Sequence, residues 1–531
     1  MHQRIRRILA SGPLALLAGC ALFAGGTGSP DYDLIITGGE TYDGDGRQLD
    51  GVDIAIRDGN IARIAPALSE SASAKLVVDA RGLVVAPGFI DPHTHADADL
   101  ASRDPHRRAI PAYAFQGVTT LVVGNDGHGF PALRNGDDFD PTGINVAVLS
   151  GFGDLRRTVI GDADRAPTET ERALMADLLK RDMCAGAFGF STGLYYSPQT
   201  YADTGEVIGL ARIAGNMGGY YDTHMRDESD FSVGVLAALG EALKIGREAS
   251  VPVHISHIKA LGPSVWGQSG RMIERIEAAR AEGQVVTADQ YPWRASGTRI
   301  SNALVPGWAL DGGLEGLRVR LANAELRERI AQEIADNIKR RGGPDSLLVT
   351  RSLAKDGTFA GKTLLQLAEE HGVSPESFAI SVLLQGDALL ASFNMDAADI
   401  AAFADREWVM TGSDGSSGHP RKYGTFPKAF DDLVRKGGRD IGWFVRRSSG
   451  LTAKTVGLVD RGFLREGYAA DLVIFDPAAF MPMADYAEPE RLSRGVEWLV
   501  VNGRVVIRHG EYTEALPGRL LRKQAAATAC S

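Results

Sequence analysis

Two histidines, His93 and His95, stand two residues apart at the end of the apolar run Gly88-Phe89-Ile90-Asp91. Successive side chains of a strand alternate between faces, so both imidazoles face the same way and can bind one metal ion. A His-x-His pair alone is weak evidence, because histidines this close also occur on solvated turns. A metal site here therefore requires ligands from other strand ends.

Further ligand types follow four other short apolar runs. These residues are Asp126 after the second run, His224 in the fifth, His257 after the sixth and Asp414 after the eighth. Alone, His224 is equally well explained as a core histidine, and Asp126 or Asp414 as a turn former. The occurrence of such residues at all five strand ends is much harder to explain by turns. The pattern predicts a metal centre.

The sixth run contains a second histidine, His254, three residues before His257. An odd separation places two side chains of one strand on opposite faces, whereas Lys259 shares the face of His257. We therefore assign His257 to the site and His254 to packing.

Eight short apolar runs separated by helix-like segments predict a (β/α)8 TIM barrel over residues 86–455. Its strands are expected near residues 89–91, 120–123, 146–149, 188–190, 220–222, 253–256, 285–288 and 408–411. An insertion at about 295–405 separates the last two runs, with helices expected at 324–341, 363–370 and 375–385. In such barrels the carboxyl ends of the strands carry the active site, which is where the ligands lie.

Both ends of the chain are rich in β-branched residues and glycine turns. Residues 31–85 and 456–515 share this pattern, with an Asn502-Gly503 hairpin signal in the second. We expect them to form one small composite β-sandwich domain, followed by a C-terminal tail at 516–531. The overall fold class predicted is α/β.

The composition is that of an ordinary globular protein. Subtracting 67 acidic from 57 basic residues gives a formal charge of −10, and the chain has no long basic run, which argues against nucleic acid and favours a small-molecule substrate. Three cysteines in 531 residues exclude a disulfide scaffold. Of these, we interpret Cys184 as a small buried apolar residue and place Cys530 in the tail.

The first 19 residues read as an export signal, with Arg4, Arg6 and Arg7 before an apolar run too short to span a bilayer. The sequence Leu17-Ala18-Gly19-Cys20 resembles the bacterial lipoprotein lipobox, which implies lipidation of Cys20. The alternative is a plain signal peptide with a chance cysteine. Residues 20–30 form a glycine-rich tether, and Ala21 after the cysteine favours the outer membrane. We expect a periplasm-facing lipoprotein that contacts the membrane only through this anchor.

The chain resembles the amidohydrolase superfamily and, within it, the N-acyl-D-amino-acid deacylases, over nearly all of its mature length. The shared motifs are Pro87-Gly88-Phe89-Ile90-Asp91-Pro92-His93-Thr94-His95, Gly117-Val118-Thr119-Thr120, Gly193-Leu194-Tyr195-Tyr196-Ser197-Pro198, His224-Met225-Arg226-Asp227-Glu228, Val253-His254-Ile255-Ser256-His257-Ile258-Lys259, Ser413-Asp414-Gly415 and His419-Pro420-Arg421-Lys422-Tyr423-Gly424-Thr425-Phe426-Pro427. The later histidine motifs and Tyr-Gly-Thr-Phe-Pro are specific to the deacylase branch.

The resemblance implies that His93, His95 and Asp414 form one metal position, and His224 with His257 the core of a second. It implies one or two Zn²⁺ ions. The sequence departs from the family at Asp126, where a cysteine ligand is usual, and at Phe152, where histidine is common. A carboxylate is a harder ligand than a thiolate, so other divalent metals such as Mn²⁺ become acceptable, and it can bridge two ions.

The implied activity is hydrolysis of the amide of N-acyl-D-amino acids, with Asp414 exchanging protons with water and the leaving amine. The substrate carboxylate requires cations or donors, for which Lys259, Tyr291 and Arg421 are the candidates. Alternatives are a metal-dependent dipeptidase, a cyclic-amide hydrolase or a lipid-anchored binding protein without turnover. Cyclic-amide relatives use a carboxylated lysine at the fourth strand, and no lysine stands between Lys180 and Lys244. The oligomeric state is not readable from these residues.

Overall fold

The computed structural model describes residues 29–130, 139–353, 359–524 and 530, and its centre is a (β/α)8 barrel. The parallel barrel strands are β8 (Phe89–Asp91), β9 (Val118–Val123), β10 (Asn145–Val148) continued by β11 (Ser150–Gly151), β12 (Gly189–Gly193), β13 (Tyr220–His224), β14 (Val253–Ile255), β15 (Val286–Gln290) and β20 (Val409–Thr411). A parallel bridge between Thr94 and Gly415 links the ends of β8 and β20. The predicted strands correspond to these elements.

The barrel strands are buried along their whole length, as in β9, because the barrel interior covers one face and helices the other. The covering helices include α5 (Phe152–Ile160), α6 (Glu169–Cys184), α7 (Thr204–Asn216), α8 (Val235–Ala249), α9 (Ser269–Ala281), α16 (Arg421–Phe430), α17 (Ile441–Val445) and α18 (Leu451–Val456). The short helices α2 (Asp97–Leu100), α3 (Pro105–Arg108) and α4 (Pro111–Ala114) follow β8. This arrangement brings the carboxyl ends of all the barrel strands to one mouth.

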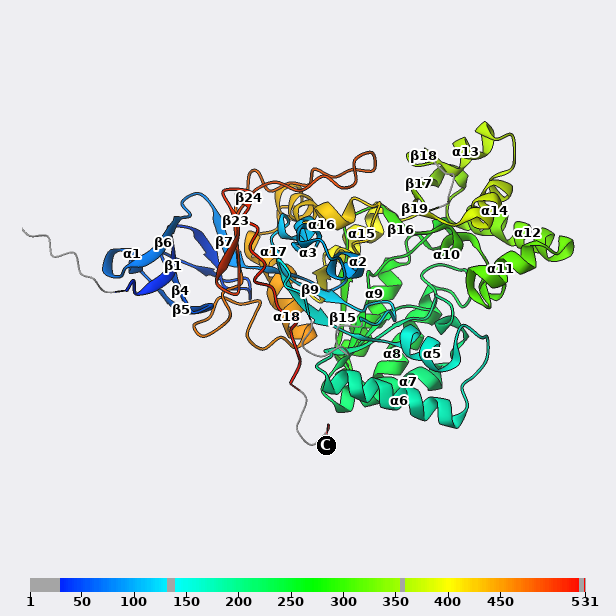
Figure 1. The fold of residues 1–531 in the computed structure, drawn as a ribbon, viewed down its shortest axis with the longest axis horizontal. Helices are drawn as coiled ribbons and strands as arrows, with labels where there is room; N and C mark the ends of the chain where they lie inside the picture. Colours follow the sequence, from blue (N-terminus) through cyan, green and yellow to red (C-terminus); the bar gives the residue numbers. More distant parts are fainter. Residues whose placement is uncertain (1–28, 131–138, 354–358, 525–529, 531) are drawn as a thin grey trace, which may run out of the picture.

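Two further sheets, built from both ends of the chain, lie at one end of the molecule (Figure 1). The first has the order β5 (Asn60–Ala65), β4 (Asp53–Arg57), β1 (Tyr32–Thr37) and β6 (Ala74–Asp79). The second has the order β24 (Glu511–Tyr512), β23 (Arg504–Arg508), β22 (Val496–Val501), β21 (Leu472–Phe475), β7 (Val84–Pro87), β2 (Glu40–Tyr42) and β3 (Gln48–Leu49). Apolar side chains from both sheets share one core, so the two ends of the chain are packed together.

The insertion after β15 lies on the opposite side of the barrel from these sheets (Figure 1). Its helices include α10 (Ile300–Leu304), α11 (Gly313–Leu321), α12 (Ala324–Arg340), α13 (Leu364–Glu370), α14 (Pro375–Gln385) and α15 (Ala397–Ala404). It also contains an antiparallel sheet that the sequence analysis did not predict, in the order β16 (Ala295–Arg299), β19 (Ala388–Phe393), β17 (Leu347–Ser352) and β18 (Lys362–Thr363). The insertion has its own apolar core and stands beside the barrel mouth.

The C-terminal segment runs beside β10. Leu521 N donates to Val146 O (2.7 Å) and Gly518 N to Thr142 O (2.8 Å). Cys530 then forms a disulfide with Cys184, the last residue of α6. The interpretation of Cys184 as a buried apolar residue was therefore wrong, since it is exposed and disulfide-bonded.

Residues 1–28, which include Cys20 and the predicted export signal, lie outside the described residues. Within the residues that the structure describes, no helix is both long enough and apolar enough to cross a bilayer.

Candidate metal centre

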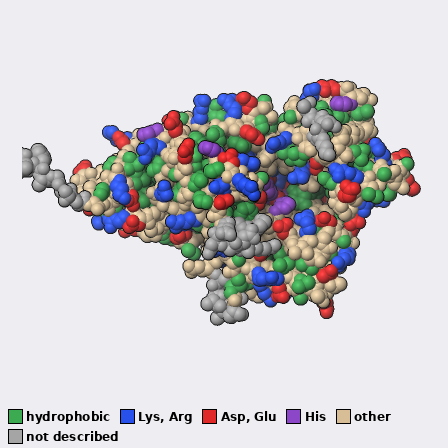
Figure 2. All heavy atoms as spheres, viewed as in Figure 1, with side chains coloured by type: hydrophobic (Ala, Val, Ile, Leu, Met, Phe, Trp, Pro, Cys, Tyr) green, Lys and Arg blue, Asp and Glu red, His purple; other side chains and the backbone are tan. Residues whose placement is uncertain are grey.

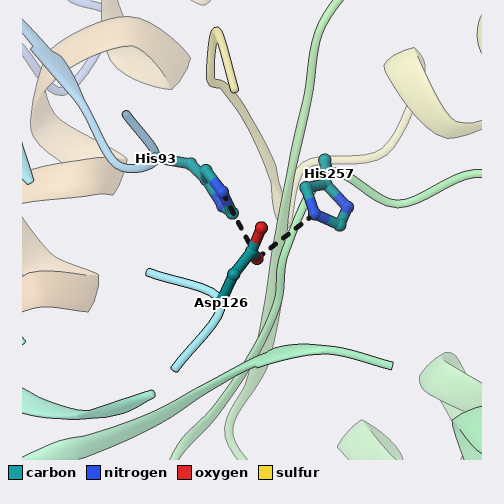
Figure 3. Close-up of side chains that lie close together, drawn as sticks. All are labelled: His93, Asp126 and His257. Atoms are coloured by element: carbon teal, nitrogen blue, oxygen red, sulfur yellow. Dashed lines mark ion pairs between the residues drawn. The ribbon is translucent and has the colours of Figure 1, made fainter. Parts of the chain in front are cut away.

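The carboxylate of Asp126 lies at the centre of a group of histidines at the barrel mouth. Its Oδ1 is 3.5 Å from His93 Nε2 and 3.5 Å from His257 Nε2, as Figure 3 shows. The same oxygen is 3.8 Å from His224 Nδ1, and Oδ2 is 3.5 Å from His95 Nε2. Ligand atoms about 2.1 Å from a tetrahedral zinc ion are about 3.4 Å apart. The spacing therefore fits ligands around a cation better than hydrogen bonds.

The carboxylate of Asp414 lies close to two of these histidines, His93 and His95, which follow β8. Its Oδ1 is 3.2 Å from His95 Nε2 and 3.7 Å from His93 Nε2. His93, His95 and Asp414 form one set of nitrogen and oxygen atoms that can hold a metal ion, and the carboxylate of Asp126 lies 3.5 Å from both histidines.

A second set lies on the other side of Asp126. His224 Nδ1 is 3.0 Å from His257 Nε2, and Asp126 Oδ1 faces both rings. Because Asp126 belongs to both sets, its carboxylate is placed to bridge two ions.

Glu228 is a carboxylate that the sequence analysis did not assign to the site. Its Oε1 is 3.1 Å from His257 Nδ1 and 2.7 Å from Lys259 Nζ, and its Oε2 is 3.8 Å from His224 Nε2. A carboxylate on the far nitrogen of a ligating imidazole orients the ring and increases its basicity. The i, i+4 spacing from His224 to Glu228 is the sequence signal that points to this residue.

Two ligand atoms at this site are buried and have no hydrogen-bond partner among the described residues. They are His93 Nε2 and Asp126 Oδ1. Leaving such atoms unpaired costs free energy, so the donor set fits a cation that completes it. Six side chains offering imidazole nitrogen and carboxylate oxygen are the ligands that zinc and similar divalent metals bind.

The electrostatics of the site also favour a cation. Burial opposes protonation of His95, but the carboxylates of Asp126 and Asp414 outweigh burial and raise its pKa to about 10. Burial likewise disfavours the charged form of Asp414, yet the Arg421 guanidinium and neighbouring imidazoles hold its pKa well below the ordinary value. Asp414 is therefore ionised throughout the physiological pH range.

The backbone at three of the site residues is in the left-handed region, with φ of +56° at Asp126, +36° at His257 and +47° at Asp414. Such conformations persist where surrounding contacts determine them. Gln199 Nε2 donates to Asp126 O (2.9 Å), and a Cβ at Gly127 would lie 2.0 Å from Gln199 Oε1. The loop that carries Asp126 therefore requires glycine at position 127 and is held in place.

His254 lies away from the ligand group, with its Nδ1 3.0 Å from Thr287 Oγ1 and its Nε2 3.0 Å from Asp289 Oδ1. Strand alternation does not explain the position of His257, because β14 ends at Ile255 and the chain then turns. Asp289 Oδ1 also accepts from His257 N at 2.9 Å, which ties this turn to β15.

The three residues predicted to bind a substrate carboxylate lie together. Lys259 Nζ is 5.8 Å and Arg421 Cζ is 4.7 Å from the centre of the Tyr291 ring. Arg421 Nη1 is also 2.7 Å from Asp414 Oδ2, so this cation already contacts the ligand group. Lys259 and Tyr291 line a small cavity that His224, His257 and Asp414 also line.

A larger cleft of about 660 Å³ opens on the other side of the ligand group, between the barrel and the insertion. His95, Asp126 and Asp414 line it from the barrel, and Leu314 and Arg351 from the insertion. Histidine side chains are visible in a hollow near the centre of the face in Figure 2. The ligand group is thus reachable by a small molecule.

The sequence profile of the amidohydrolase family matches residues 76–264, which include the proposed ligands at the carboxyl ends of β8, β9, β13 and β14. The chain is 34% identical over 533 residues to a D-aminoacylase of Alcaligenes xylosoxydans xylosoxydans, covering 94% of this chain and 99% of that protein. The chain belongs to the D-aminoacylase family of amidohydrolases. It is also 34% identical to an N-acyl-D-aspartate deacylase of the same organism, over 92% and 95% of the two chains.

Solved structures agree with this membership. A D-aminoacylase structure with a binuclear metal centre has a TM-score of 0.76 and 32% identity, covering 93% of this chain and 100% of that one. An N-acyl-D-glutamate deacylase from Bordetella bronchiseptica, complexed with zinc and a phosphonate inhibitor, has a TM-score of 0.76 and 31% identity over 92% and 99%. As a D-aminoacylase family member, the protein is a metal-dependent amidohydrolase with the predicted TIM barrel and small domain.

Proposed function

We propose that the protein hydrolyses the amide bond of N-acyl-D-amino acids to a carboxylate and a free D-amino acid. One observation carries the proposal: an ionised carboxylate, Asp414, is shared between the metal-ligand group and a cavity that also presents Lys259 and Tyr291. Similarity over nearly the whole chain to deacylases of N-acyl-D-amino acids supports the same substrate class.

Asp414 is placed to move the proton. A divalent metal bound to this ligand group supplies Lewis acidity, which polarises a carbonyl and acidifies water. Asp414, held ionised beside Arg421, accepts the proton of the attacking water and delivers it to the amide nitrogen as the C–N bond breaks. The water oxygen thereby ends in the carboxylate product, and the proton on the free amine.

Tyr196 adds a neutral donor beside this group. Its hydroxyl is 3.4 Å from His224 Nδ1, and burial raises its pKa well above the ordinary value, so it stays protonated at neutral pH. It therefore donates a hydrogen bond to the carbonyl oxygen as negative charge develops there. Lys259, Tyr291 and Arg421 bind the α-carboxylate and set the distance of the amide from Asp414.

For the metal, we propose one tightly held Zn²⁺ and a second, partly filled position. The shared position of Asp126 supports two neighbouring ion sites, and the carboxylate supports acceptance of harder metals such as Mn²⁺. Elemental analysis of the purified protein checks the count and the identity.

A panel of substrates tests the activity. N-acetyl-D-amino acids, their L enantiomers and dipeptides are assayed at equal concentration with the zinc-loaded protein. We expect hydrolysis of the D compounds at least about tenfold faster than of the others. Faster cleavage of dipeptides or of L substrates would assign the site to a different hydrolase activity.

We further propose that the protein is an exported lipoprotein anchored at Cys20 on the periplasmic side of the outer membrane. The disulfide between Cys184 and Cys530 supports an oxidising compartment, because cytosolic thiols are kept reduced. Fractionation of cells that express wild type or Cys20→Ala tests the anchor. We expect wild type in the membrane fraction and the variant in the soluble fraction, and equal solubility would contradict the anchor.

A further inference from the structure

A positively charged side chain from the insertion, that of Arg341, lines the small cavity beside the metal ligands. The cavity has a volume of about 40 Å³, and its lining includes His257, Lys259 and Asp414 of the barrel. Phe231 and Arg341 also line it, and Arg341 is the residue that follows α12 of the insertion. The insertion thus contributes a charged side chain, beside residues of β16, to a cavity that barrel residues also line.

The Arg341 side chain is held firmly in this wall. Only 3% of the residue is exposed, and its Nε donates to Ala303 O at 3.0 Å. Its Cζ lies 5.1 Å from the centre of the Phe231 ring. These contacts fix the plane of the guanidinium but do not neutralise its charge.

No carboxylate of the described residues lies within 4.0 Å of the Arg341 guanidinium. Two other buried arginines are paired with carboxylates: Arg156 Nη1 is 2.6 Å from Glu206 Oε1, and Arg421 Nη1 is 2.7 Å from Asp414 Oδ2. A buried charge without a counter-ion is costly, because desolvation is not offset by attraction. A pre-oriented, unpaired guanidinium in a cavity wall is suited to binding a carboxylate of the ligand.

The other positively charged side chains near the cavity pair with a carboxylate of the protein or are assigned to the α-carboxylate of the substrate. Lys259 is paired with Glu228, and Lys259 and Arg421 are assigned above to the α-carboxylate of the substrate. An N-acyl amino acid with a neutral side chain carries only this one carboxylate. Arg341 is therefore suited to bind a second carboxylate, which the substrate carries on its side chain.

We propose that Arg341 binds the side-chain carboxylate of the substrate, so that the preferred substrates are N-acyl derivatives of acidic D-amino acids. This inference rests on the proposed deacylase function.

Matched substrate pairs test the inference with the zinc-loaded full chain. N-acetyl-D-aspartate is compared with N-acetyl-D-asparagine, and N-acetyl-D-glutamate with N-acetyl-D-glutamine, since each pair differs in charge and hardly in shape. We expect kcat/KM to be at least about tenfold higher for the acid in one or both pairs, from the charge-assisted hydrogen bonds. Equal or lower values for both acids would overturn the proposal.

Two variants locate the effect. Arg341→Met, which keeps length but removes charge, is expected to lower the acid-to-amide ratio of kcat/KM by about 10²-fold, and Arg341→Lys to lower it less. An equal loss for acids and amides would overturn the proposal, because it is the outcome for an α-carboxylate or purely structural role. Metal content and thermal unfolding report whether each variant has folded, and the wild-type ratio decides the matter if Arg341→Met does not fold.

Failure of this inference is distinguishable from failure of the proposed function. If wild type cleaves none of the N-acyl-D-amino acids, the deacylase function is wrong. If it cleaves the amides as fast as the acids and Arg341→Met leaves the ratio unchanged, only the role of Arg341 is wrong.

Discussion

Two buried polar clusters in this protein differ in whether their polar groups have hydrogen-bond partners. At the junction of the barrel and the small sheets, Asp471 accepts from Asn145 Nδ2 (2.9 Å) and Asn502 N (2.6 Å) and pairs with Arg461. Asn502 Nδ2 donates to Asn145 Oδ1 at 2.8 Å, so the members of this junction cluster satisfy one another. At the barrel mouth, by contrast, His93 Nε2 and Asp126 Oδ1 have no hydrogen-bond partner in the part of the chain that the structure describes.

This difference separates stability from function. A polar network that is fully satisfied fixes one arrangement of the chain, whereas a buried group without a partner is destabilising unless a ligand completes it. The metal cluster also has three residues with positive φ, whereas the junction cluster has one, Asn502, so the geometry of the metal cluster depends more on the surrounding fold. Variants in the two clusters should therefore fail in different ways.

The largest effect is expected from Asp414→Asn. The variant keeps size and most contacts but cannot accept a proton, so kcat should fall by about 10²-fold or more while the protein folds and largely keeps its metal. Steady-state kinetics and elemental analysis measure both. The control is His254→Ala, since His254 bonds Thr287 and Asp289 and should not change metal content in the folded protein. A rate near wild type for Asp414→Asn, with its metal retained, would remove Asp414 from proton transfer.

Next in size is the effect of Asp126 on metal affinity. Asp126→Asn removes the charge at the centre of the ligand group and should weaken metal binding by at least about tenfold, whereas Asp126→Cys supplies a thiolate ligand and should retain it. Competition with a chromogenic chelator gives the affinities. Identical affinity in Asp126→Asn and wild type would mean that Asp126 is not a ligand.

Substitutions in the junction cluster should lower the free energy of unfolding and leave metal binding unchanged. Arg461→Met leaves Asp471 buried without its cation and should cost about 3–5 kcal/mol, and adding Asp471→Leu should restore much of this loss. Denaturant unfolding of the single and double variants measures the loss and the recovery. Metal content of the folded protein should stay at the wild-type value in both. Loss of metal at unchanged stability would contradict the division between the clusters.

The smallest effect is expected at an exposed pair, where water replaces lost contacts. Hydrogen bonds from Arg165 and from the Thr168 backbone lower the pKa of Glu171 to about 2, below its ordinary 4.5. Because the folded-state pKa is lowered, the carboxylate stabilises the protein above about pH 4.5, and this is lost as the pH falls through about 2. Glu171→Gln should lower Tm slightly at pH 7, and the difference should shrink in acid. A Tm difference between wild type and variant that grows in acid would contradict this direction of the pH dependence.

The sequence predicted the barrel because eight apolar runs alternate with helical segments, and it indicated ligands because they follow those runs directly. It did not reveal the insertion sheet, in which Ala295 pairs with Phe393 across a long stretch of chain. The disulfide between Cys184 and Cys530 has a separation of 346 residues, so spacing gave no signal for it. Arg341 reaches the site only through tertiary packing, which no local pattern encodes, whereas the short spacing from His224 was a signal for Glu228.

The central claim is that this ligand group holds the metal on which amide hydrolysis depends. The most direct measurement is to remove metal with a chelator, dialyse, and titrate Zn²⁺ back while following hydrolysis of an N-acetyl-D-amino acid and bound zinc together. We predict loss of activity on removal and recovery in proportion to zinc up to one equivalent. Activity that survives chelation, with less than about half an equivalent of any transition metal bound, would contradict the claim.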